Sequence, residues 1–412
     1  MHDHTAHLVP EAERRVARRL VYGVAGVGIL ALVGLLVLWP RGPAPDPGFS
    51  TEGLRYPTAV IQAIEPGSCD TVEAVAPVEC DLVTIRIASG EAEGDVATMQ
   101  VSARDTHIPE LEVGDRLIVQ HNPMAPDEWA YTYWEHERAL PLVALAALFV
   151  VAVLALGRWQ GARALAGLGL SVGIVLAFLL PALIRGRPAL AVALVAATLI
   201  AFVALYLAHG VTLETTVALI GTLGSLLLIT LLAVTFVHLA HLTGLSGDDA
   251  QLLRVSAEAL DPAGVLLAGI IIGALGVLDD VTVTQVAAVA EIRAANPALG
   301  AAELYRRALR VGRDHIAATV NTLVLAYVGA SLSTLLFFAR STRPATQILG
   351  QEVVAIEVVR TLVGSIGLVA AVPLTTALAA VIAGRRRSEG DAAAAPSTPD
   401  GRPSWEDFAP EA

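Results

Sequence analysis

The sequence predicts an all-α polytopic membrane protein of about eight spanning helices, with a small extracytoplasmic β-barrel-like domain between the first and second spans. The chain is 55% hydrophobic and only 16% charged, whereas a soluble domain carries about 25% charged residues. Residues 41–139 are the exception, with 18 acidic residues and 6 arginines, a difference of −12 that equals the net charge of the whole chain. We therefore expect an acidic soluble segment within a nearly neutral hydrophobic protein. The basic residues are few and scattered, so no nucleic-acid partner is expected.

Long apolar runs identify the spans, because a helix needs about 20 apolar residues to cross a bilayer. The predicted spans are 20–39, 140–157, 164–184, 189–208, 212–237, 264–290, 315–338 and 353–383. The first has too long an apolar run for a signal peptide, and no small-residue cleavage site follows before Pro40, so we interpret it as an uncleaved anchor. Residues 140–384 then form a seven-helix membrane core.

Arginine-rich loops set the predicted orientation, because such loops stay in the cytoplasm. The basic segments are the N-terminus 1–19, the loop with Arg158 and Arg163, residues 293–313, and Arg385–Arg387. Alternation through eight spans places all of them, and both termini, on the cytoplasmic side of the plasma membrane. Arg185 and Arg187 alone would lie outside, so their hairpin is the weakest part of this topology. The polar tail 385–412 is expected to be disordered.

The acidic segment has the pattern of a β-domain at residues 50–136. Short β-type runs alternate there with Gly, Pro and Asp turns, which is typical of a small barrel or sandwich. The expected strands are 56–64, 81–88, 96–103, 116–121 and 130–134. Cys69 and Cys80, the two cysteines of the chain, are a disulfide candidate if the domain faces an oxidising exterior. The alternative is two unpaired thiols.

An acidic pair, Asp279 and Asp280, falls near the middle of the sixth span. A charge at the centre of a spanning helix costs about 2.5–3.5 kcal/mol, and such residues usually meet a cation, a proton or water. The pair therefore has three interpretations: ion conduction, proton relay or metal binding; a structural ion pair or helix cap; or a pair nearer the interface than the span boundaries suggest. Because adjacent helical side chains point about 100° apart, the two carboxylates are not expected to face one partner.

The same span carries Gly269, Gly273 and Gly276 on one helix face, and small residues at that spacing predict a close helix crossing.

Other polar residues fall on the last three spans. Gln285 and Asn321 are candidates to line a path, although a single Asn in a span also commonly bonds a neighbouring helix. Glu357 and Arg360 are three residues apart, so they are expected either to pair on their own helix or to place Arg360 against an Asp of the sixth span.

His238 and His241 have an H-x-x-H spacing and are followed by Asp248 and Asp249. Imidazoles with carboxylates can bind a divalent metal, but two histidines at a helix end are also common without one, so the metal assignment stays open. The sequence has no P-loop, H-E-x-x-H or G-x-S-x-G motif, so neither an enzyme nor a cofactor is expected.

Several long motifs are similar to those of the YibE/F family of bacterial membrane proteins. They are Ala268–Asp280, Gly312–His315, Thr319–Ser331 and Glu357–Gly367, with the stretch His238–Leu253. The resemblance covers about 140–384 and implies a multi-pass membrane protein whose substrate and catalytic residues are uncharacterised. The double Asp resembles an actinobacterial-type version of the motif, and other versions carry a single Asp, which argues against a role that needs both carboxylates.

The leading functional hypothesis is a transporter or channel-like permease in which both aspartates are buried and one of these buried carboxylates handles a cation or proton. In it, Gln285 and Asn321 line the path and Arg360 balances charge. The partners are then the lipid bilayer and a small ion or solute. The alternative is a membrane sensor or assembly partner that binds a protein through the external β-domain.

Overall fold

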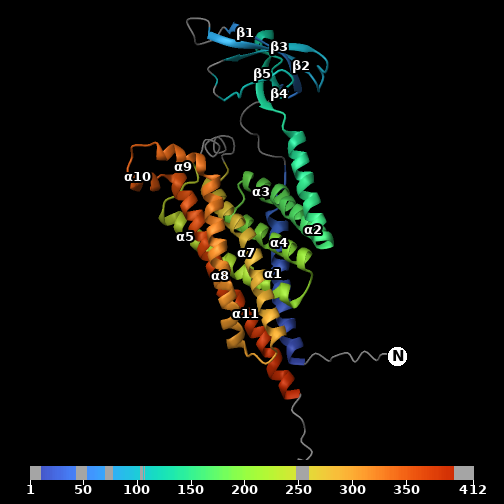
Figure 1. The fold of residues 1–412 in the computed structure, drawn as a ribbon, viewed down its shortest axis with the longest axis vertical. Coiled ribbons are helices and arrows are strands. Elements are labelled where there is room, and N and C mark those ends of the chain that lie inside the picture. Colours follow the sequence, from blue (N-terminus) through green and yellow to red (C-terminus); the bar gives the residue numbers. More distant parts are fainter. Residues whose placement is uncertain are drawn as a thin grey trace, which may run out of the picture. The chain divides into compact units, whose positions relative to one another are not determined.

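The computed structural model describes residues 11–42, 53–69, 78–102, 105, 107–246 and 259–393. The chain divides into two compact units. One comprises 1–46 and 157–412, and the other comprises 47–156. Figure 1 shows the first as helical and the second as a small sheet followed by the start of a helix. Each unit has its own hydrophobic core.

The second unit contains a five-stranded antiparallel sheet in the order β3-β2-β1-β4-β5. Its strands are β1 Thr58–Cys69, β2 Val78–Ile87, β3 Val96–Ser102, β4 Arg116–His121 and β5 Tyr131–His136. All five lie close to the predicted runs. Alternate residues of β2 point inward, so that Val83, Ile85 and Ile87 are buried together with Met99 and Leu117. The period of two in the sequence therefore produces the core of this unit directly.

The two edge strands of the sheet approach each other, as a barrel would require. Strands β3 and β5 are in contact, although no ladder joins them within the described residues. The pKa of the Tyr131 hydroxyl is raised, mainly by burial and to a smaller extent by the nearby negative charge of Asp95. Because Tyr131 begins β5 and Asp95 directly precedes β3, this proximity is a second sign of the approach. The described unit is a curved sheet, and full barrel closure stays a prediction.

Cys80 of β2 is disulfide-bonded. Cys69, the other cysteine of the sequence, ends β1, which pairs with β2 in a register that sets Gly67 opposite Cys80. The Cys69 side chain lies outside the described residues, so the predicted partner is compatible with this register and stays a prediction.

The first unit is built from long apolar helices, together with the end of α2. The helices are α1 Glu11–Leu38, α2 Ala139–Ile174, a π-helical turn Val175–Leu179, α3 Leu180–Ile184, α4 Ala189–His209, α5 Leu213–Leu239, α7 Pro262–Ala295, α8 Ala301–Ala330, α9 Leu332–Ala339, α10 Ala345–Leu349 and α11 Glu352–Ala393. Helix α11 includes the first residues of the predicted tail, and residues 394–412 lie outside the described chain.

Six described helices are long and apolar enough to cross a membrane, or seven if the bent pair α8 and α9 counts as one span. The expected number was about eight. One part of the difference lies at α8 and α9, which are bent by 67°. The other lies in Ala139–Ile184, which counts as one 46-residue candidate although it contains both predicted spans, 140–157 and 164–184. Helical geometry is broken between those two spans at Arg158, where φ is 48°.

Helix α7 is the centre of the helical unit, since it contacts α4, α5, α8 and α11. It buries a set of Leu, Ile, Val and Ala side chains against these neighbours. At the α11 end of the bundle, the Glu352 carboxylate accepts hydrogen bonds from the backbone N–H groups of Thr243 and Gly244. Glu352 is the first residue of α11, and its carboxylate joins this helix to the segment after α5. A negative charge at a helix N-terminus is also favourable, because it interacts with the helix dipole.

The close helix crossings are not at the predicted glycines. Gly269, Gly273 and Gly276 are exposed, and a Cβ at Gly269 or Gly276 would meet no atom within 4 Å. The prediction of a tight crossing there is wrong, because no helix backbone packs against these glycines; a Cβ at Gly273 would meet only the Tyr327 hydroxyl of α8, at 3.3 Å. The crossing forms instead between α5 and α11, where a Cβ on Gly221 would clash with Thr375 Oγ1.

This packing predicts opposite effects for two matched substitutions. Gly221→Ala should lower the stability of the detergent-solubilised protein by about 1–3 kcal/mol, because overpacking forces the backbones apart. Gly269→Ala should leave stability unchanged or raise it slightly, because alanine is the better helix former and has room there. Thermal unfolding of the two variants checks this. Equal melting temperatures would contradict the assignment of the α5–α11 crossing.

Candidate functional site

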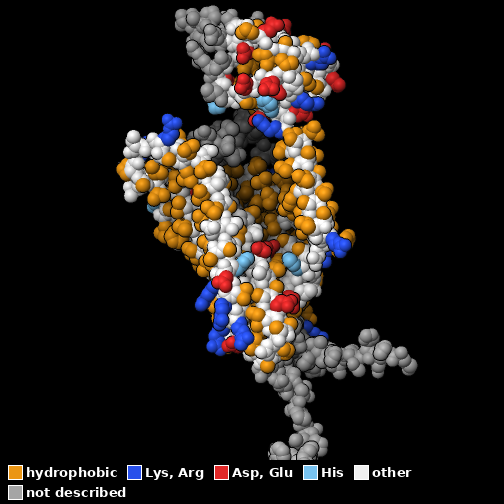
Figure 2. Space-filling view, in the orientation of Figure 1, with side chains coloured by type: hydrophobic (Ala, Val, Ile, Leu, Met, Phe, Trp, Pro, Cys, Tyr) orange, Lys and Arg blue, Asp and Glu red, His pale blue; other side chains and the backbone are white. Residues whose placement is uncertain are grey.

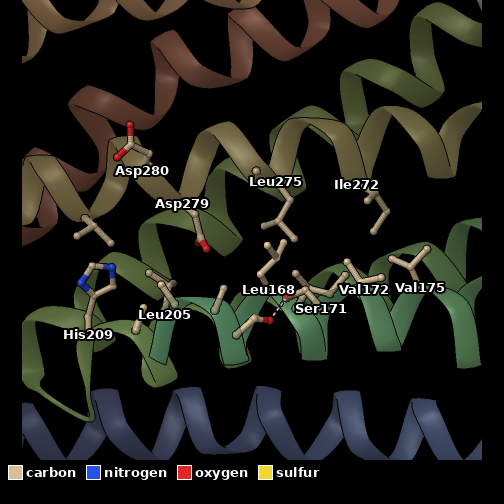
Figure 3. A pocket seen from close by; sticks show the side chains of 17 residues that line it. Leu168, Ser171, Val172, Val175, Leu205, His209, Ile272, Leu275, Asp279 and Asp280 are labelled. Atoms are coloured by element: carbon tan, nitrogen blue, oxygen red, sulfur yellow. Dashed lines mark hydrogen bonds between the residues drawn. The ribbon is translucent and has the colours of Figure 1, made fainter. Parts of the chain in front are cut away.

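Asp279 and Asp280 lie at the midpoint of α7. The helix has 34 residues, and at a rise of 1.5 Å per residue each end is about 25 Å from the pair. If α7 crosses the bilayer symmetrically, the carboxylates are thus as far from water along the helix axis as this helix allows. Figure 3 shows that the two side chains point in different directions, as their adjacent positions predict.

The Asp279 carboxylate points toward a cavity of about 500 Å³. Three segments wall it: the last part of α2 with the π-helical turn that follows, the second half of α4, and the middle of α7. We call it the α7 cavity. Thirteen of its 17 lining residues are Ala, Gly, Val, Leu or Ile, and the other four are Ser171, His209, Asp279 and Asp280. It is therefore an apolar space with a carboxylate at its wall.

The structure corrects the expectation that both carboxylates are buried. Asp279 is half-buried and Asp280 is exposed. One oxygen of Asp279, Oδ1, is nevertheless shielded from solvent and accepts no hydrogen bond from any described residue. Asp280 lines the edge of the cavity and points away from its interior (Figure 3). Asp279 is consequently the carboxylate that is placed to meet a cation inside the cavity.

Two polar residues of the cavity were not identified from the sequence. His209 is exposed in the last turn of α4, and the hydroxyl of Ser171 donates a hydrogen bond to the Gly167 carbonyl oxygen (Figure 3). Only the helix packing brings them to α7, since each is far from Asp279 in sequence. The π-helical turn beginning at Val175 was a second missed feature, and such turns are frequent at functional sites.

Gln285 lies apart from the cavity, in a buried polar seam between α5, α7 and α11. Its Oε1 accepts a hydrogen bond from the Thr376 hydroxyl at 3.0 Å. Thr222 and Thr282 hydrogen-bond to each other at 2.7 Å and join α5 to α7. These side chains are buried. Gln285 therefore holds helices together, and only its Nε2, which has no described partner, is left for another role.

The remaining candidates on the last spans do not converge on Asp279. Glu357 and Arg360 form an ion pair on α11 with Nη1 and Oε1 2.8 Å apart, as the first of the two alternatives predicted. Glu357 lines a different cavity of about 450 Å³, which lies between α8, α9 and α11. Asn321 is exposed on α8. None of these three residues lines the α7 cavity, in which Asp279 lies with residues of α2 and α4, so their grouping with the acidic pair stays a prediction.

His238 and His241 are exposed at the end of α5. Asp248 and Asp249, their suggested partners, lie outside the described residues. Within the described ranges, no group of three or more His, Cys, Asp or Glu side chains could hold a metal ion. The metal assignment therefore gains no support from the described geometry.

Comparison with known proteins identifies the class to which these helices belong. A model of the YibE/F-like protein family matches residues 145–385, which is more than half of the chain. The chain is a member of the YibE/F-like family, as its motifs indicated. No curated protein and no solved structure matched the chain.

The unpaired Asp279 predicts a stability cost that substitution can reveal. Asp279→Leu should raise the free energy of unfolding of the purified protein by up to about 2.5 kcal/mol, and its melting temperature with it, because it removes a carboxylate from an apolar wall. Thr282→Val, one turn along the same helix, should lower it by about 0.6 kcal/mol through loss of an interhelical hydrogen bond. If Asp279→Leu lowered stability as Thr282→Val does, Asp279 would have a structural partner.

Proposed function

We propose that this protein is a membrane transporter or channel-like permease that binds a cation or proton at Asp279. The observation that supports this most is the unpaired, shielded Oδ1 of Asp279 at the wall of a cavity of about 500 Å³. A carboxylate kept at the middle of an apolar helix is costly, and such residues usually mark the path of an ion or proton.

The proposed roles differ from the initial hypothesis for the other polar residues. Arg360 is held by Glu357 on α11, so it is not available to balance the charge of Asp279. Gln285 contributes to helix packing through Thr376. His209 lines the cavity together with the two aspartates, and its imidazole is the side chain that would pass protons to the cavity.

The distribution of charge supports the proposed orientation of the path. Exposed arginines gather where α8 begins, at one end of the helical unit (Figure 2), and they include Arg306, Arg307 and Arg310. Positive charge favours the cytoplasmic face. We accordingly propose that this end, with the start of α1 and the end of α11, faces the cytoplasm.

Flux through reconstituted protein tests the proposal. In liposomes under an imposed pH gradient, the wild type should carry protons or exchange them for a cation, and Asp279→Asn should lose at least about ten-fold of this flux, because the neutral amide cannot bind a proton or balance a charge. Glu291→Gln provides the matched control, because Glu291 is exposed on the same helix and lines no cavity described here. Equal flux in wild type and Asp279→Asn would refute the assignment of Asp279.

The β-domain supports a second candidate, a membrane sensor or assembly partner that recognises a protein. The domain is a compact unit with its own core, and it exposes an aromatic pair, Tyr56 and Trp134, whose rings lie 5.0 Å apart. Exposed aromatic residues are enriched where proteins bind one another.

Deletion of residues 50–136 discriminates these two functions. A transporter core should still insert and give flux near that of the full chain, because the helical unit has its own core. A sensor should lose its partner and leave the helical unit without measurable flux. Comparing flux with partner recovery for the full and deleted chains makes the test, and loss of both on deletion would contradict an autonomous transport core.

A further inference from the structure

The size of the α7 cavity indicates more than a bound proton or metal ion. Its volume of about 500 Å³ lies within the range of about 300–1,000 Å³ that is typical of sites for small organic molecules. A bare inorganic ion would fill a small part of this space. Water would have to fill the rest of the cavity, and the apolar wall cannot form hydrogen bonds with that water.

The lining also lacks the ligands that an inorganic cation needs. Ca²⁺ takes 6–8 oxygen ligands, and Mg²⁺ keeps an octahedral shell. In the α7 cavity, Asp279 presents its carboxylate, whereas the Ser171 hydroxyl is already directed to the Gly167 carbonyl. Most of the other walls are hydrocarbon. An inorganic ion would therefore find few protein ligands in the cavity, and water would have to supply most of its coordination shell.

The combination of one carboxylate with a large apolar surface matches a cation that carries apolar bulk. In such a molecule the charge is spread over or shielded by hydrocarbon, so transfer out of water costs less than for a compact ion. The Asp279 carboxylate lines the cavity and forms no ion pair with any described residue, so it can supply the single countercharge. The walls from α2, α4 and α7 supply the apolar contact.

We propose that the α7 cavity binds a lipophilic organic monocation, such as a quaternary ammonium or phosphonium compound, with Asp279 as its countercharge. This inference rests on the proposed function, because it names the substrate class of the same site. A cation of this class would compete with a proton for Asp279, so that inward proton movement could be exchanged for outward cation movement.

The glycines of α7 allow the space itself to be tested. Gly276 lines the cavity, and a Cβ placed there meets no atom within 4 Å. A leucine at 276 would therefore enter the cavity without displacing backbone. Gly269 lies two turns earlier on the same exposed face with equally open surroundings, and it does not line the cavity. Gly276→Leu and Gly269→Leu are consequently a matched pair of variants.

Equilibrium binding of radiolabelled tetraphenylphosphonium to the purified full chain is the test. Saturable binding to the wild type is expected. Gly276→Leu should weaken it through lost space and Asp279→Asn through lost charge, each by at least about ten-fold. Gly269→Leu should bind as the wild type does. An excess of Na⁺ or Mg²⁺ at constant ionic strength should not displace the ligand.

Three outcomes would overturn the inference: no saturable binding, equal binding by Asp279→Asn, or displacement by Na⁺ or Mg²⁺. Equal binding by Asp279→Asn would identify the space as one that holds acyl chains through apolar contact alone. Asp279-dependent proton flux without phosphonium binding would remove the substrate class and leave the transport proposal standing. Asp279-dependent binding without any flux would support the substrate class and refute the transport proposal. The two failures are therefore distinguishable.

Discussion

The free-energy cost of one carboxylate at the midpoint of an apolar helix constrains how the helical unit is arranged. Asp279 cannot pack against hydrocarbon on all sides, and no described residue neutralises or hydrogen-bonds its shielded oxygen. The surrounding helices meet this constraint by leaving a space between α2, α4 and α7, walled largely by small and branched apolar residues. The other face of α7 does the opposite and closes against α5, α8 and α11 through buried side chains and hydroxyl pairs. One side of α7 is thus closely packed, and the side that carries Asp279 opens onto the cavity.

That division explains why polar residues within the same spans have different roles. The hydroxyls of Thr222, Thr282 and Thr376 lie in the closed interface, where hydrogen bonds between helices replace bonds to water. Glu357 neutralises Arg360 on the same helix and so removes both from the electrostatics of the α7 cavity. Asp279 alone on α7 combines shielding, a missing partner and access to a cavity, which are the features expected of a ligand-binding carboxylate rather than a structural one.

The local features of this protein followed from sequence, whereas its helix neighbours did not. Strand positions and apolar spans are visible as periods of two and as long hydrophobic runs, and the five strands lie close to their expected places. The glycines at 269, 273 and 276 have the spacing of a close crossing, yet this spacing does not identify a partner helix. The sequence suggested partners for Asp279 on the later spans, because those spans carry the polar residues Asn321, Glu357 and Arg360. The cavity that Asp279 lines instead contains Ser171 and His209 from earlier helices. Their proximity to Asp279 depends on how the helices pack around α7, and the local sequence carries no signal of it.

The most direct test of this account is covalent labelling with a hydrophobic carbodiimide, which reacts with carboxyl groups in apolar surroundings, followed by mass spectrometry of the peptides. We expect modification of Asp279 in the wild type and little modification of the ion-paired Glu357. We also expect protection of Asp279 in Gly276→Leu, where the leucine occupies part of the cavity that Asp279 lines. Modification of Glu357 with Asp279 unreacted, or equal labelling of Asp279 with and without the leucine, would contradict the claim that Asp279 faces an accessible apolar cavity.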